Sequence, residues 1–353
     1  MHTWGRQLRD STRRDGLRVP GRDPDAVGGS ETGLGTAAQP KAGRLPGNGQ
    51  GPARITLGGA QNLVISCDNA LILPRLPDNQ FQLIYIDPPF NTGRRQQRLT
   101  LETRRDADGD RTGFGGRTYT TTERGRISYK DLFADYAQFI EPRLTEARRL
   151  LAADGTLYFH IDYREAHYCK VLLDEVFGRD CFLNEIIWAY DYGAKPKRRW
   201  PAKHDTILVY VKDPERYFFD QEAVDRIPYM APGLVTPEKA DRGKVPTDVW
   251  WHTIVPTNGR EKTGYPTQKP EGILRRIIQA SSAPGEWVLD FFAGSGTTGV
   301  VAGQLGRRFV LVDEAPEALT VMRRRIGSFG VEYLDANGLV LNADRYDEAQ
   351  ELF

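Results

Sequence analysis

The chain has 353 residues, of which 39% are hydrophobic, and its formal net charge is +1. A charge so close to zero excludes a uniformly basic or acidic surface, so any binding surface for a polyanion must be local. The three cysteines form no CxxC pair, the five histidines are scattered, and no 18-residue apolar stretch is present. These features exclude a disulfide framework, a zinc-finger spacing and a membrane span. We therefore expect a soluble cytoplasmic protein without a metal site.

Residues 1–52 are rich in Gly, Arg, Pro and Asp and show no apolar periodicity. Such a segment cannot bury enough apolar surface to offset its ordering entropy. We therefore expect a disordered tail at 1–52 and a folded domain over residues 53–353.

Short apolar runs and helical patterns alternate through the folded part. Strands are predicted at 63–65, 81–86, 156–161, 185–190, 206–211, 287–292 and 308–313. Helices are predicted over 131–153, 164–177 and 316–325, and in the segments that follow Pro270 and Gly299. This alternation is typical of an α/β fold with a doubly wound sheet. Residues 331–341 are expected to add a hairpin around Asn337-Gly338.

The strand at 81–86 ends in Asp87-Pro88-Pro89-Phe90. The two prolines remove two backbone donors and fix φ at both positions, so this turn is stiff. The Asp87 carboxylate and a backbone carbonyl then face outward as acceptors beside the Phe90 ring, at the edge of the sheet where ligands bind. Two acceptors and a π-surface suit a planar amine such as the amino group of a nucleobase. The structural alternative is a strand that simply ends in a Pro-rich turn.

Two long segments break the α/β alternation. Residues 94–130 are polar and basic with many Gly and Thr residues, which predicts a mobile loop. This loop is a candidate lid or DNA-contacting segment, and a tolerated insertion is the alternative. Residues 213–262 are rich in Pro, Asp and Arg and predict an inserted subdomain. Their polar side chains are of types that read base edges, so target recognition is predicted here; a structural insert is the alternative.

Between these two segments, residues 195–203 hold five basic residues and one tryptophan without an acid. Such a run can neutralise phosphates while the ring stacks on a base, whereas a solvated surface is the alternative. The candidate DNA-binding residues are Lys195, Lys197, Arg198, Arg199 and Lys203.

A glycine-rich turn, residues 294–299, follows the strand that ends near Asp290, and Asp313 ends the next strand. This is the pattern of a dinucleotide site, because the glycines allow close backbone approach and a helix N-terminus follows. However, Asp290 and Phe291-Phe292 crowd the turn, which suits a cofactor without a pyrophosphate. Only 40 of the 353 residues follow Asp313. The sheet must therefore be completed by strands from earlier in the chain.

Together with Thr267-Gln268-Lys269-Pro270, these two motifs resemble those of the beta-class DNA amino-methyltransferases in identity, order and spacing. Residues 85–93 and 203–210 look especially similar to the modification subunits of type III restriction systems, although those subunits are much longer. The resemblance implies a Rossmann-like, seven-stranded methyltransferase sheet in circularly permuted order. It also implies S-adenosyl-L-methionine as methyl donor and a base amino group in double-stranded DNA as acceptor.

The resemblance implies roles for individual residues. The catalytic motif would be Asp87, Pro88, Pro89 and Phe90. The cofactor-binding residues would be Asp290, Phe292, Ala293, Gly294, Ser295 and Gly296 at the turn, Asp313 at the ribose, Asp68 near the adenine, and Thr267, Gln268 and Lys269 at the methionine end. Glu314-Ala315 departs from the family pattern, so either Asp313 or Glu314 could hold the ribose.

The expected function is methylation of adenine N6 in DNA, which would associate the protein with the nucleoid. A cytosine-N4 enzyme is the nearest alternative, but those more often have Ser where Asp87 stands. An RNA or protein amide methyltransferase would usually place the glycine-rich strand first, and here it comes late. A catalytically silent DNA-binding protein would not need an intact Asp87 and glycine turn. The recognition sequence, a cognate restriction endonuclease and a homodimer stay open.

Overall fold

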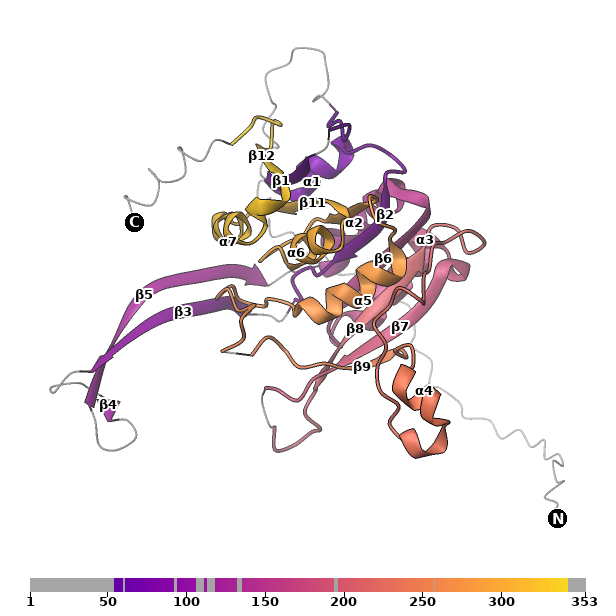
Figure 1. Cartoon of the computed structure of the whole chain (residues 1–353). Coiled ribbons are helices and arrows are strands. Elements are labelled where there is room, and N and C mark those ends of the chain that lie inside the picture. The colour runs from indigo at the N-terminus through magenta and orange to yellow at the C-terminus, as the bar shows by residue number, and fades with distance from the viewer. Residues whose placement is uncertain are drawn as a thin grey trace, which may run out of the picture. The chain divides into compact units, whose positions relative to one another are not determined.

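The computed structural model describes residues 54–59, 61–91, 94–105, 111–112, 118–131, 135–193, 196–256 and 258–341. The predicted tail at 1–52 lies outside these residues. Within them, the strands form one nine-stranded sheet and one separate three-stranded sheet (Figure 1).

The nine-stranded sheet is mixed. Its spatial order is β12 (Val331–Asp335), β1 (Asn62–Ser66), β11 (Arg308–Asp313), β10 (Trp287–Asp290), β2 (Phe81–Ile86), β6 (Leu151–Ile161), β8 (His204–Val211), β7 (Phe182–Ala189) and β9 (Val249–Trp251). The strands from β12 to β6 are all parallel to their neighbours, whereas β8 is antiparallel to both β6 and β7. Strands β10 and β11, late in the chain, therefore lie between the two earliest strands.

Helices cover both faces of this sheet. On one face lie α1 (Asn69–Ile72), α2 (Tyr136–Leu150) and α3 (Ala166–Phe177); on the other lie α5 (Glu271–Ser281), α6 (Thr297–Gln304) and α7 (Pro316–Ile326). The packing of strand β2 explains why its sequence is continuously apolar. Ile84 and Ile86 belong to the core under α2, whereas Leu83 and Tyr85 belong to the core under α5. A strand buried on both faces needs apolar residues at every position.

The remaining short helices are η1 (Leu73–Arg75), η2 (Arg179–Cys181), η3 (Pro232–Leu234), α4 (Pro237–Arg242) and η4 (Gly327–Phe329). Among the residues that the structure describes, no helix is long and apolar enough to cross a membrane. The helix predicted over 131–153 begins only at Tyr136, because the Asp135 side chain accepts a hydrogen bond from the Gln138 amide at 3.1 Å and caps it. It ends at Leu150, because Leu151 is already extended and opens β6.

The prediction of seven strands was wrong, because two further strands join the edges of the sheet. Strand β9 comes from the 213–262 segment and pairs in parallel with β7 over only three residues. Strand β12 pairs in parallel with β1, so the predicted 331–341 hairpin is reduced to a turn with one antiparallel bridge, Leu334 to Val340. Both strands cover backbone groups that an edge strand would expose.

The prediction of a loop at 94–130 was also wrong. Strands β3 (Arg94–Arg105), β4 (Arg111–Thr112) and β5 (Thr118–Asp131) form the separate antiparallel sheet. The segment lacks apolar alternation, but its threonines favour extended backbone. A role as a lid or DNA-contacting segment stays a prediction.

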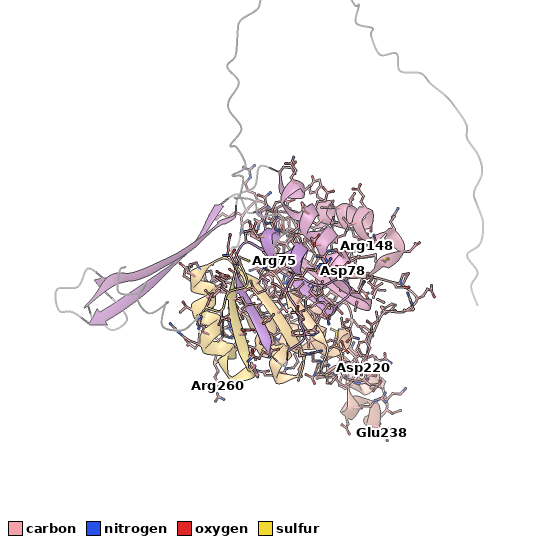
Figure 2. All side chains as sticks on the ribbon, turned by 90° about the horizontal axis from the view of Figure 1, so that it is seen from above. Arg75, Asp78, Arg148, Asp220, Glu238 and Arg260 are labelled. Atoms are coloured by element: carbon pink, nitrogen blue, oxygen red, sulfur yellow. The ribbon has the colours of Figure 1, made fainter. Side chains whose placement is uncertain are left out.

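The 213–262 segment contains η3, α4 and β9, and a bridge joins Ile227 to Lys244. Its polar side chains reach solvent: Glu238 and Arg260 are exposed and point away from the body of the protein (Figure 2). The segment therefore presents polar side chains outward while β9 ties it to the main sheet.

Candidate active site

The two motifs of the sequence meet because their strands are neighbours. Strands β2 and β10 pair in parallel, with Leu83 opposite Val288 and Ile84 opposite Leu289. Asp87 and Asp290 therefore emerge at the same edge of the sheet. Strand β11, on the other side of β10, brings Asp313 to that edge as well.

A pocket opens at this edge, between the Asp-Pro-Pro-Phe turn, the glycine turn and the segment before α5. Most of the predicted catalytic and cofactor-binding residues line it: Asp87, Pro88, Pro89, Phe90, Thr267, Gln268, Lys269, Asp290, Phe292, Ala293, Gly294, Ser295 and Asp313. Tyr85 and Tyr265 also line it, although the sequence did not single them out.

Two predicted cofactor-binding residues do not line this pocket. Asp68 instead caps α1, accepting the Ala70 amide at 2.9 Å, and pairs with Arg143 at 3.1 Å. Gly296 is the N-cap residue just before α6, with a φ of 74°, and a Cβ there would lie 2.7 Å from the Cγ of Met322. Gly296 is therefore required by backbone geometry and packing.

Asp313 fastens the glycine turn to β11. Its Oδ2 accepts the Gly294 amide at 2.7 Å and its Oδ1 accepts the Ala315 amide at 2.9 Å. Burial raises the pKa of Asp313 to about 6, although these hydrogen bonds favour the ionised carboxylate. Glu314 is exposed and does not line the pocket. Of these two acids, only Asp313 lines the pocket.

Asp290 is a buried carboxyl whose two oxygens both accept hydrogen bonds. The Thr298 hydroxyl donates to it at 2.6 Å and the Phe292 amide at 3.0 Å. Burial raises the pKa of Asp290 to about 7, against the effect of both bonds. Asp290 thus joins the end of β10 to the first turn of α6.

Asp87 is bonded on one side only. Its Oδ2 is ion-paired with the ammonium of Lys269, which lies 5.1 Å from the centroid of the Phe90 ring. Its Oδ1 is buried and has no hydrogen-bond partner among the described residues. A buried acceptor without a donor is costly, so this oxygen is available to a ligand that carries an N–H group.

The glycine turn has a second anchor that the sequence did not reveal. Arg325 in the last turn of α7 donates to the Ser295 carbonyl and to the Thr297 hydroxyl, each at 2.9 Å, and pairs with Glu271 at 3.2 Å. An arginine in the last turn of a helix is typical of an exposed position. No sequence signal therefore distinguished Arg325 from an ordinary surface arginine.

The segment before α5 is held in a strained conformation. Gln268 accepts the Thr263 amide at 2.9 Å and donates to the Glu261 carbonyl at 2.6 Å. Thr267 has a φ of 59°, which is a rare conformation for a β-branched residue. Strain of this kind concentrates at ligand sites. It leaves Thr267 and Lys269 facing the pocket.

A second pocket adjoins the first and shares Phe90, Thr267, Gln268 and Lys269 with it. Its remaining walls include the aromatic and acidic residues Tyr163, Trp188, Tyr190, Tyr192, Asp162 and Asp205, together with the basic residues Arg164, His204 and Lys262. Aromatic walls with a few polar groups are typical of a site for a planar heterocycle.

The basic run lies at the rim of this second pocket, because Gly193 and Ala202 line it. Lys197, Arg198 and Arg199 are exposed, as is Trp200, whereas Lys195 lies outside the described residues. Lys203 behaves differently, since it donates to the Gly193 carbonyl at 3.2 Å and only 22% of its side chain is exposed. This hydrogen bond ties Lys203, the last residue of the run, to a residue just before the start of the run.

A buried polar cluster behind Asp87 was missed by the sequence analysis. His160 on β6 is completely buried between Asp87 and Asp205, and Tyr85 bonds to its ring. A histidine within the apolar run 156–161 was the available signal. Its partners become neighbours only through the pairing of β6 with β2 and β8.

Comparison with known proteins agrees with the two motifs. A family profile described as DNA methylase matches residues 81–324. Type II methyltransferase M.HpaI of Haemophilus parainfluenzae is 30% identical over 74% of this chain and 73% of its own length. DNA adenine methyltransferase YhdJ of Escherichia coli K12 is 30% identical over 76% of this chain and 84% of its own.

Among solved structures, the cytosine-N4-specific PvuII DNA methyltransferase shares the fold, with a TM-score of 0.53 and 16% identity over 82% of this chain and 99% of its own. The family profile covers more than half of the chain, and two relatives reach 30% identity over about three quarters of it. This chain therefore belongs to the N6/N4 DNA methylase family.

Proposed function

We propose that this protein transfers a methyl group from S-adenosylmethionine to the N6 amino group of adenine in double-stranded DNA. The observation that supports this most strongly is the unbonded Asp87 Oδ1, which faces a pocket shared with the glycine turn. The cofactor would occupy this first pocket and the target base the second. The position of late strands β10 and β11 among early strands agrees with a circularly permuted methyltransferase sheet.

The residues of the first pocket fit such a cofactor, which supplies an electrophilic methyl group on a positively charged sulfur. Gly294 allows close approach of its backbone, since a Cβ there would come 3.2 Å from the Tyr265 ring. Asp313 has lone pairs left on both oxygens for ribose hydroxyls. Thr267, Gln268 and Lys269 lie where the methionine end would bind. None of these residues needs a pyrophosphate in the cofactor as its binding partner.

Asp87 and Pro88 supply the chemistry at the amine. An exocyclic amine is a poor nucleophile because its lone pair is delocalised into the ring. Acceptors on its two N–H groups, Asp87 Oδ1 and the Pro88 carbonyl, favour a pyramidal nitrogen and stabilise the positive charge that develops during attack. The stiff Pro88-Pro89 turn holds these acceptors in place, so that the nitrogen is presented in line with the methyl group.

The target base must leave the duplex to reach Asp87. Phe90 and Tyr190 would stack on the flipped base within the second pocket. Lys197, Arg198 and Arg199, exposed on the run that begins and ends at this pocket, would contact the flanking phosphates. The 213–262 segment would then read neighbouring base edges.

Adenine is favoured over cytosine by two features. Asp87 occupies the position where cytosine-N4 enzymes more often have Ser, and the similar protein YhdJ is named as an adenine methyltransferase. The PvuII enzyme acts on cytosine N4, but at 16% identity it supports the fold alone.

The test uses the full-length protein, duplex DNA of mixed sequence and S-adenosylmethionine with a deuterated methyl group. The DNA is then digested to nucleosides, which are separated by chromatography and identified by their masses in mass spectrometry. We expect deuterated N6-methyldeoxyadenosine. Deuterated N4-methyldeoxycytidine would move the target to cytosine. Calorimetry that detects binding of NAD but not of S-adenosylmethionine would overturn the assignment.

A further inference from the structure

A buried imidazole connects the carboxylate at the amine pocket with a second carboxylate. His160 is 0% exposed. Its Nδ1 lies 3.9 Å from Asp87 Oδ1, and its Nε2 lies 3.2 Å from Asp205 Oδ2. Tyr85 bonds to Nδ1 through its hydroxyl at 2.8 Å, and Tyr190 donates to the other oxygen of Asp205 at 2.9 Å.

The hydrogen bonds determine which ring nitrogen is basic. Burial alone raises the pKa of Asp205, but its bonds and the nearby charges outweigh burial and leave that pKa below its ordinary value. An ionised carboxylate only accepts hydrogen bonds, so Nε2 must carry the hydrogen that Asp205 accepts. In neutral His160 the lone pair is then on Nδ1, where the Tyr85 hydroxyl donates to it. The basic nitrogen is thus bonded to Tyr85 and lies 3.9 Å from Asp87 Oδ1, beyond hydrogen-bond distance.

Packing does not explain this array. The ring of His160 contacts Trp188 and Phe90, with centroid distances of 5.5 and 5.8 Å. An aromatic hydrocarbon could fill that space without the cost of burying a polar group and an ionised partner. The array lies directly behind the one oxygen of Asp87 that has no donor among the described residues.

We infer that His160 is a positioning residue that accepts, through Asp87, the proton released by the methylated amine. This inference rests on the proposed function. When the N–C bond forms and the S–C bond breaks, the electron pair of the S–C bond stays on sulfur and the nitrogen keeps one proton too many. That proton passes to Asp87 Oδ1 and then, when the Tyr85 hydroxyl turns away from Nδ1 and Asp87 approaches it, to Nδ1 of His160. The resulting imidazolium is stabilised by Asp205 through Nε2–H.

The surroundings of His160 favour this direction of transfer. Asp87 and Tyr85 face it from β2, Asp205 from β8, and Tyr190 follows β7. Asp162 acts electrostatically on Tyr190, and Lys269 acts on Asp205. The imidazolium that forms on transfer would lie between Asp205 and Asp87. Asp87 would return to its ionised state before the next turnover.

The first test is His160→Gln, because the glutamine amide can donate to Asp205 but has no basic nitrogen. Single-turnover methyl transfer on duplex DNA is measured between about pH 5 and 9, the range in which histidine titrates. In the wild type, the rate should fall at acidic pH as Nδ1 takes up a proton in advance. The variant should lose about 10²-fold in rate near neutral pH, at the lower end of the effect of a positioned proton acceptor. Its remaining rate should not show the fall at acidic pH that the wild type shows.

The matched control is Tyr158→Phe, two residues earlier on β6. It removes another buried hydrogen bond, from Tyr158 to Ser281 at 2.8 Å, that does not involve Asp87. This variant should lower the melting temperature but keep the wild-type rate and pH profile. Affinities for S-adenosylmethionine and DNA should stay within about twofold in both variants, because neither side chain contacts them in this account.

A second variant tests the tautomer. Asp205→Asn keeps the shape but can donate to Nε2, which would move the hydrogen to Nδ1 and turn the basic nitrogen away from Asp87. It should reproduce the slow rate of His160→Gln. A folded His160→Gln protein with wild-type rate and pH profile would overturn this inference and leave the proposed function intact. A wild-type protein that methylates no base would instead refute the proposed function.

Discussion

Asp87 and Asp290 end neighbouring parallel strands at the same edge of the sheet, yet their surroundings differ. Asp290 accepts hydrogen bonds on both oxygens, from Thr298 and Phe292, and is buried. Asp87 has one oxygen paired with Lys269 and one buried oxygen without a donor among the described residues. Asp290 thus has a donor from its own protein on each oxygen, whereas one buried oxygen of Asp87 has none among the described residues.

This difference indicates a structural role for Asp290 and is consistent with the reactive role proposed for Asp87. Asp290 ties β10 to α6 and so fixes the glycine turn, and its raised pKa is the cost of that burial. Asp87 lies on a turn stiffened by two prolines and faces the pocket. Substitutions at the two positions should therefore affect different properties.

The largest effect is expected at Asp290, whose titration should make the free energy of unfolding depend on pH. Its pKa is about 7 in the folded protein against an ordinary 3.8, so the folded state binds a proton that the unfolded chain releases above about pH 4. The free energy of unfolding should fall as pH rises from about 4 to 7, by up to roughly 4 kcal/mol from this group.

The substitution Asp290→Asn should remove that contribution. Urea unfolding of wild type and variant at several pH values in this range measures the difference. Asp313, whose pKa is raised to about 6, contributes in the same direction in both proteins and cancels. If the free energy of unfolding changed equally with pH in the two proteins, Asp290 would not be a buried acid with a raised pKa.

At Asp87 the expected effect is on catalysis. Asp87→Ala should lower single-turnover methyl transfer by roughly 10²–10³-fold, as for other lost electrostatic partners of a transition state. The affinity for S-adenosylmethionine should be retained, because the glycine turn and Asp313 are untouched. A rate within a few-fold of wild type would place the reactive acceptor elsewhere.

A smaller effect is expected on DNA affinity from the basic run. Replacing Lys197, Arg198 and Arg199 by Ala should weaken binding to all sequences alike and reduce the salt slope by about 0.9 per lost phosphate contact. Fluorescence anisotropy at several salt concentrations measures it. Arg148, labelled in Figure 2, and Arg179 are exposed arginines outside the basic run and provide the control pair. Equal slopes for both variants would make the run a solvated surface.

The smallest effect on the reaction itself is expected from the 213–262 segment. Exchanging it for the corresponding segment of a relative with another specificity should change which sites are methylated, since each good base contact discriminates by about 1–3 kcal/mol. Genome-wide mapping of methylated sites measures this. An active chimera that keeps the original sites would assign recognition to another segment, with 94–130 the next to exchange.

Some features could be predicted from the sequence because they are local. Continuous apolar runs identified seven strands of the main sheet, and the residue types of the two turns identified most of the first pocket. Asp68 and Gly296 do not line the first pocket; the structure shows Asp68 as a helix cap and Gly296 in a packing contact, and a cofactor-binding role for either stays a prediction. Acids and glycines serve both purposes, so residue type alone could not separate them.

Other features depend on contacts between distant residues. His160 and Asp205 are 45 residues apart in sequence and meet through the antiparallel pairing of β6 with β8. The ion pair between Asp87 and Lys269 joins residues 182 positions apart. Strands β3 and β5 pair without an apolar face in their sequence, so periodicity gave no signal for them.

The most direct test of the central claim is a structure of the full-length protein with duplex DNA and S-adenosylhomocysteine, which cannot donate a methyl group. The account predicts a flipped adenine in the second pocket, with N6 at hydrogen-bond distance, about 3 Å, from Asp87 Oδ1 and the Pro88 carbonyl. Asp87 should accept this bond at the oxygen that is open here. A flipped base whose amino nitrogen contacts neither acceptor would contradict the account.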